Sequence, residues 1–109
     1  MMTLATAALR QRVRIEQPLA PPGEGGGSAI TWQPVATVWA RVKAATSREP
    51  LTADAPFGVT LYDVTMRYRD DVDPSMRFVL AGRILNVVSA VDPDGYRRWL
   101  VCRAEERTR

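Results

Sequence analysis

Short runs of alternating apolar and polar residues, separated by turn-forming residues, constrain the fold of this chain more than any other feature. Near the start, Val13 and Ile15 alternate with charged neighbours, a pattern typical of a strand with one buried face. The same period of two recurs in residues 29–33 and 35–44 (a run that we expect Pro34 to interrupt), 58–69, 77–81, 83–91 and 96–103. About six short strands predict a mainly β protein, a small antiparallel β-barrel or sandwich.

Proline, glycine and aspartate mark the connections between these runs. We expect tight turns at residues 70–75, at Ala81-Gly82 and at residues 92–95, where Pro and Gly suit the required turn angles. Residues 18–28 are rich in Pro and Gly and predict a long flexible loop. In the insertion 46–58, Ser47 followed by an early proline predicts a short helix over about 48–55.

The length of 109 residues supports a single domain spanning 1–109. A barrel of this size buries a modest core, so it gains stability from oligomerisation. No apolar run has the eighteen or so residues of a membrane span, and the stretch before Arg10 carries no basic residue, unlike a signal peptide. We therefore expect a soluble protein made inside a cell, with no membrane partner.

The absence of histidine and the presence of one cysteine remove most catalytic and metal-binding chemistry. Histidine general bases, histidine triads and histidine metal sites cannot form. Cys102 lies in an alternating run, which predicts a buried and inert thiol. Aspartates in the turns 70–75 and 92–95 are expected to cap their own backbone; the alternative, a cation bound at residues 70–73, lacks the glycine and glutamate of a calcium loop. We expect no enzyme activity, no cofactor and no metal.

Arginines and tryptophans offer a second interpretation. The net charge is +3, and Lys43 is the only lysine among fifteen basic residues. Arginines together with Trp32, Trp39 and Trp99 would suit a stacking groove for single-stranded nucleic acid, but twelve interspersed acids favour a solvated, ion-paired surface. Trp39 lies on the polar face of its run, so it belongs either to the core, through a local bulge, or to a protein interface.

The order and spacing of several segments resemble a known family. The stretch WQPVATVWARV at residues 32–42 is followed by MRYR at 66–69 and GRILNV at 82–87. Together with the arginine-rich opening at residues 9–15, this order resembles the head–tail joining family, the head-closure or stopper proteins of long-tailed phages. The resemblance runs from about residue 9 to residue 104.

The resemblance implies a small β-barrel that assembles into a ring, with sixfold symmetry, in the neck of a virion. The ring would lie between the portal and its adaptor on one side and the tail terminator or tail tube on the other. It would retain packaged double-stranded DNA, and it would be assembled in the bacterial cytoplasm, for a phage, a prophage remnant or a gene transfer particle.

Two segments and two strand residues are the candidates for the interfaces of such a ring, because core residues are not free for partners. Segment 46–58 is the better candidate to face the DNA channel. The candidate interface and channel residues are Trp39, Arg41, Ser47, Arg48, Glu49, Leu51, Asp54, Phe57, Gly25, Gly26 and Gly27. Two alternatives within the neck are a tail terminator and an adaptor ring, and the β-rich sequence disfavours the adaptor. The alternative from another class is a small-barrel protein that binds single-stranded nucleic acid.

Overall fold

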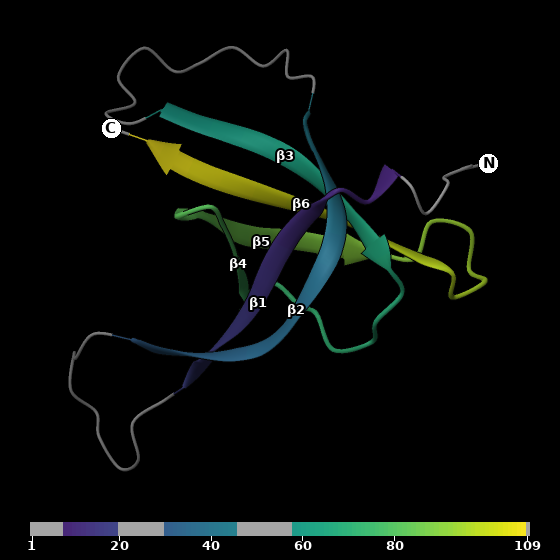
Figure 1. Cartoon of the computed structure of the whole chain (residues 1–109), viewed down its shortest axis with the longest axis horizontal. Coiled ribbons are helices and arrows are strands. Elements are labelled where there is room, and N and C mark those ends of the chain that lie inside the picture. The colour runs from purple at the N-terminus through teal and green to yellow at the C-terminus, as the bar shows by residue number, and fades with distance from the viewer. Residues whose placement is uncertain (1–7, 20–29, 46–57, 109) are drawn as a thin grey trace.

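Six antiparallel strands form the protein in the computed structural model, which describes residues 8–19, 30–45 and 58–108. The strands are β1 (Gln11–Leu19), β2 (Thr31–Ala44), β3 (Gly58–Arg67), β4 (Arg77–Leu80), β5 (Arg83–Val91) and β6 (Trp99–Thr108). They close into a barrel in the order β1-β2-β3-β6-β5-β4 (Figure 1). The expectation of a mainly β antiparallel barrel is confirmed.

The boundaries of several elements differ from the sequence prediction. Pro34 does not interrupt the second run, because β2 continues through it with a shift of register opposite Ile15 and Glu16. The predicted loop 18–28 begins too early, since Pro18 and Leu19 still pair with β2. The third strand ends at Arg67, and the last one runs from residue 99 to 108 rather than from 96 to 103. The predicted helix at 48–55 lies outside the described residues.

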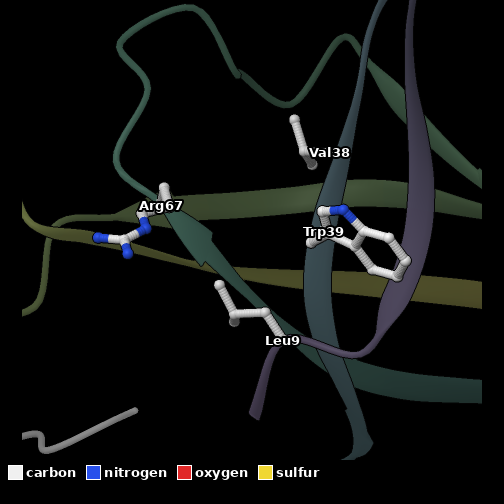
Figure 2. Close-up of a pocket in the computed structure, with 4 residues that line it drawn as sticks. All are labelled: Leu9, Val38, Trp39 and Arg67. Carbon is white, nitrogen blue, oxygen red and sulfur yellow. The ribbon is translucent and has the colours of Figure 1, made fainter. Parts of the chain in front are cut away.

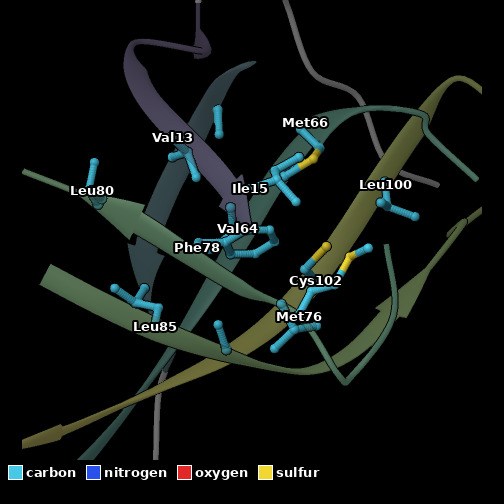
Figure 3. Close-up of a cluster of buried hydrophobic side chains, with 13 residues drawn as sticks. Val13, Ile15, Val64, Met66, Met76, Phe78, Leu80, Leu85, Leu100 and Cys102 are labelled. Atoms are coloured by element: carbon cyan, nitrogen blue, oxygen red, sulfur yellow. The ribbon is translucent and has the colours of Figure 1, made fainter. Parts of the chain in front are cut away.

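Apolar residues at alternate positions of the strands meet inside the barrel. Val13 and Ile15 of β1 are almost completely buried, as are Val64 and Met66 of β3 and Phe78 of β4. Figure 3 shows these side chains with Leu85 of β5 and Cys102 of β6 in one cluster. Burial of each large side chain is worth about 1.5–3 kcal/mol, so this cluster stabilises the closed sheet.

The turns between the strands have the conformations and hydrogen bonds that their residue types predict. Ala81 and Gly82 both have positive φ, 51° and 80°, as a two-residue hairpin turn matched to the strand twist requires. In the turn before β6, the Asp92 carboxylate accepts hydrogen bonds from the backbone N–H groups of Gly95 and Arg97, both at 3.0 Å. Asp73 likewise accepts from the backbone N–H of Ser75 at 2.8 Å. The prediction that these aspartates cap their own backbone is confirmed.

Within the described ranges, no helix is long and apolar enough to cross a membrane.

Candidate interaction surface

Arginine and tryptophan alternate in one row across the outside of four neighbouring strands. Arg12 of β1 is paired in register with Trp39 of β2, and Arg67 of β3 is paired with Trp99 of β6. Ala40 pairs with Met66, so Trp39 and Arg67 occupy the next positions along the same two strands. The row therefore runs Arg12, Trp39, Arg67, Trp99 across β1, β2, β3 and β6.

Each tryptophan of this row has an arginine over its ring. The guanidinium carbon of Arg12 lies 5.1 Å from the centroid of the Trp39 ring, and that of Arg67 lies 5.1 Å from the Trp99 ring. Both distances are within the range of a cation–π interaction. Trp99 is 8% exposed, whereas Trp39 is 52% exposed. The row thus presents one accessible aromatic ring, with positive charge at its side.

A pocket opens beside Trp39, where β2 and β3 cease to pair. It has a volume of about 380 Å³ and is lined by Leu9, Val38, Trp39 and Arg67. Figure 2 shows these four side chains around a common space: Leu9 from the segment before β1, two residues from β2 and Arg67 from the end of β3. Among the described residues, Leu9, Val38 and Trp39 give it an apolar lining, and the Arg67 side chain points away from these three in Figure 2. The pocket therefore suits an apolar side chain.

A second hollow shares Arg67 and continues the surface toward the turn before β6. It has a volume of about 490 Å³ and is lined by Arg67, Tyr68, Arg97, Arg98 and Trp99. Asp94 forms an ion pair with Arg98 at 2.8 Å and lies in this turn. Among the described residues that line the two hollows, this one has three arginines and the first has one.

The outward positions of β1, β2 and β3 are dominated by positive charge. Arg12 and Arg14 lie on β1, Arg41 and Lys43 on β2, and Arg67 on β3. Two carboxylates offset them locally: Asp63 accepts a hydrogen bond from Arg103 at 2.7 Å, and Glu16 one from Arg14 at 2.8 Å. Counted over the described residues of these three strands, five basic side chains stand against two carboxylates, so this face carries a net positive charge.

Other arginines serve the fold. The Glu16 side chain, almost completely buried, accepts hydrogen bonds at 2.8 Å from Arg77 and from Arg14. Burial acts to raise the pKa of Glu16, but the two arginines outweigh it and hold this pKa below its ordinary value. Arg83 donates two hydrogen bonds to Glu106, at 3.1 and 3.0 Å, and lowers the pKa of that carboxyl. The Arg77–Glu16 pair connects β4 with β1, and the Arg83–Glu106 pair connects β5 with β6. The prediction that these arginines are ion-paired is confirmed.

The structure describes two of the predicted interface residues. Trp39 is half-exposed on the outer face, so the reading that places it in the core through a bulge is wrong. Arg41 lies on the same face of β2 and lines a smaller hollow of about 220 Å³ with Arg10 and Gln11. The remaining predicted residues lie outside the described part: Gly25, Gly26, Gly27, Ser47, Arg48, Glu49, Leu51, Asp54 and Phe57.

Sequence reasoning missed three residues that complete the surface. Leu9, Val38 and Arg67 line the pocket with Trp39, yet they come from three separate segments. The only local signal was the alternation that places Trp39 and Arg41 on one face of β2 and Arg67 on the polar face of β3.

Cys102 does not contribute to any surface chemistry. Its side chain is completely buried, and burial raises the pKa of its thiol to about 12. The prediction of a buried thiol is confirmed. Among the residues that the structure describes, no three Cys, Asp or Glu side chains are grouped so as to hold a metal ion.

A protein family and several solved structures are similar to this chain. The family model of the phage head completion protein matches residues 4–107. A chain of the virion of a native gene transfer agent particle is similar in fold, with a TM-score of 0.72 and 22% identity over 92% of this chain and 96% of that one. Protein SF1141 from Shigella flexneri 2a, solved in solution, has a TM-score of 0.70 and 27% identity over 94% of this chain and 96% of that one. No curated protein matches the chain.

Proposed function

This chain belongs to the phage head completion protein family, and from that premise we propose that it is a structural subunit of the virion neck. In this proposal it is a head-closure or stopper protein, which joins the DNA-filled head to the tail and helps to retain the packaged DNA. Its work is assembly rather than catalysis. The observation that carries the proposal is the family match over residues 4–107, nearly the whole chain.

The fold supports this role through its likeness to a virion component. The gene transfer agent chain shares the same fold over almost its full length. Six strands around a small core leave the outer face of β1, β2 and β3 for contacts. A subunit whose core is small is stabilised by neighbours in an assembly.

We propose a ring of six subunits with identical head-to-tail contacts, which close only if the rotation fits. Its partners would be the adaptor or portal on the head side, the tail terminator or tail tube on the other side, and double-stranded DNA in the channel. Trp39 and Arg41 are the described candidates for these contacts. The segments 18–28 and 46–58 remain candidates as well, with 46–58 proposed to face the channel.

Electron microscopy of particles made with and without this protein tests the proposal. We expect density for the barrel in a ring between head and tail, and we expect its loss to give heads without tails beside free tails of normal length. Tails of abnormal length would instead identify a tail terminator. A ring directly on the portal would identify an adaptor, and density elsewhere in the particle would refute a neck role.

A single-strand nucleic-acid binder is the second candidate, and the Arg–Trp row is the observation that favours it. The geometry limits this function, because Trp99 is 8% exposed and leaves Trp39 as the accessible ring of the row. A dedicated binder loses about 1–3 kcal/mol per stacked base on truncation of the aromatic ring. Tight oligonucleotide binding at physiological salt that disappears in Trp39→Ala would establish the second candidate over the first.

A further inference from the structure

Strand β5 carries apolar side chains on both of its faces. Leu85 and Val87 belong to the buried core. The large apolar residues of the same strand that are exposed are Ile84 at 42%, Val88 at 46% and Val91 at 54%. An apolar run on both faces is typical of a strand that is covered on both sides. The outer face of β5 therefore has the sequence of a surface that another molecule covers.

Strand register extends this apolar surface to both neighbours of β5. Ile84 is paired with Val79 of β4, and Val91 is paired with Val101 of β6. Paired residues of antiparallel strands lie on the same face of the sheet. Val88 lies where the register between β5 and β6 shifts, so it is an extra residue on β5 and a bulge in the surface. We call Val79, Ile84, Val88, Val91 and Val101 the β5 face.

Strand β2 presents a second apolar feature on the opposite wall of the barrel. Trp39 is 52% exposed and lines the pocket of about 380 Å³ together with Leu9 and Val38. In the closed order β1-β2-β3-β6-β5-β4, two strands separate β2 from β5 in either direction. One subunit therefore cannot bring its own Trp39 pocket against its own β5 face.

Charges of opposite sign lie beside the two apolar features, at similar spacing. Arg41 follows Trp39 on the same face of β2, two positions along the strand and about 7 Å away. Glu105 of β6 is paired with Asn86 of β5, which makes it a diagonal neighbour of Val88 at about 7–8 Å. Its ion pair with Arg107 is long, 3.8 Å. The two walls are thus complementary in both apolar character and charge.

We propose that the two walls bind each other between successive copies of this chain. The β5 face of one subunit packs over Trp39 of the next, with Val88 in the pocket and Glu105 toward Arg41. Because the two halves of the contact differ, the contact is heterologous and copies join head to tail. This inference deepens the proposed function, on which it rests only for the closure of such a series into a ring.

Other occupants explain less of the geometry. Duplex DNA is bound mainly through its phosphates, to which the apolar β5 face offers no positive charge. A two-fold dimer through the β5 face alone would leave the Trp39 pocket open. A different protein on either wall would leave unexplained why this chain carries both complementary halves.

Two variants that each disable one half test the contact on the purified protein. Trp39→Asp places a charge in the β2 half, and Val88→Asp places one in the β5 half. Static light scattering up to about 1 mM protein, the concentration at which even weak contacts form, should show the unmodified protein growing beyond dimers. We expect each variant alone to associate more than tenfold more weakly.

An equal mixture of the two variants distinguishes a head-to-tail contact from any symmetric one. The Trp39→Asp copy keeps its β5 face, and the Val88→Asp copy keeps its Trp39 pocket. One intact contact can therefore form between them, and both outer ends of the pair are blocked. We expect the mixture to form dimers and nothing larger.

Charge exchange gives a second test that does not depend on the apolar residues. Arg41→Glu and Glu105→Arg should each weaken the association, and the protein with both changes should recover it because the swapped charges pair again. Ile30→Asp is the matched control: Ile30 is 61% exposed but precedes β2, at the end of the strand away from Trp39. We expect it to associate like the unmodified protein.

Four results would overturn the proposal. They are an unmodified protein that stays monomeric at about 1 mM, dimers of either aspartate variant alone, a mixture that does not form dimers, and no recovery in the charge-exchanged protein. Amide NMR spectra with the dispersion of a folded barrel accompany each variant. All these readouts use the free protein, so their failure leaves the neck position to be judged by microscopy, and absence from the neck leaves the contact intact.

Discussion

Glu16→Gln is the substitution whose effect the structure defines most sharply. The Glu16 side chain is 7% exposed and accepts hydrogen bonds at 2.8 Å from Arg77 and at 2.8 Å from Arg14. Glutamine keeps the shape but removes the charge and one acceptor. The guanidinium of Arg77, 21% exposed, then loses its carboxylate in a partly desolvated position between β1 and β4.

The expected loss of unfolding free energy follows from the different exposure of Arg77 and Arg14. A hydrogen bond to a charged group is worth about 1.5–3 kcal/mol, a value that applies to the Arg77 contact. The Arg14 side chain is 49% exposed, so its contribution falls in the range of surface ion pairs, about 0–1 kcal/mol. We expect Glu16→Gln to lower the free energy of unfolding by about 2–3 kcal/mol, a large share of the roughly 5–15 kcal/mol typical of a small domain.

Urea denaturation followed by tryptophan fluorescence measures this loss. With a slope of about 1–3 kcal/mol per molar urea, the midpoint should fall by about 1–2 M. A double-mutant cycle with Arg77→Gln should show a larger coupling than one with Arg14→Gln. Asp63→Asn is the matched control, since its ion pair with Arg103 is short, 2.7 Å, but exposed on both sides; it should cost at most about 1 kcal/mol.

The pH dependence gives an independent check of the same reasoning. The pKa of Glu16 is lowered in the folded state, so the carboxylate stabilises the fold above the ordinary Glu pKa of about 4.3. This contribution is lost as the pH falls through the folded pKa. The difference between the unmodified protein and Glu16→Gln should therefore be full at pH 7 and shrink below about pH 4. Equal costs for Glu16→Gln and Asp63→Asn, or a difference that is independent of pH, would refute the argument.

Three further predictions concern the core and a turn. Phe78→Ala empties a position that is 1% exposed, so thermal or urea unfolding should show a loss of about 3–5 kcal/mol; a loss below that of Glu16→Gln would contradict the packing of the barrel. Cys102 should react with a thiol reagent only at the rate of unfolding, because it is completely buried with a pKa of about 12; rapid labelling of the folded protein would disprove this burial. Gly82→Ala should lower the free energy of unfolding by about 1–2 kcal/mol because of its φ of 80°, since a Cβ there meets nothing within 4 Å. Ala81→Gly, the control in the same turn, should not lower it. A denaturation midpoint unchanged by Gly82→Ala would show that the turn has another conformation.

Local patterns in the sequence predicted those features that neighbouring residues decide among themselves. The period of two placed Val13, Ile15, Val64 and Met66 inside, because successive side chains of a strand point to opposite faces wherever the strand ends up. The turns at Ala81-Gly82 and at Asp92 followed from residue types whose backbone preferences are intrinsic. The error at Pro34 came from applying a rule for interior strands to a stretch that, in the described part of the chain, pairs with β1 alone.

Contacts between distant segments needed the tertiary structure. Alternation places Glu16 on the polar face of β1 with Arg12 and Arg14, yet Glu16 is buried because β4 brings Arg77 to it. Likewise, the exposed Trp39 could be read from the sequence as core or interface, and only the end of β3 beside β2 brings Arg67 to complete its pocket. The alternation of side chains is a property of one strand and can be read from its sequence. Which strand lies beside it depends on how the whole barrel closes, and the sequence pattern of a single strand does not determine this pairing.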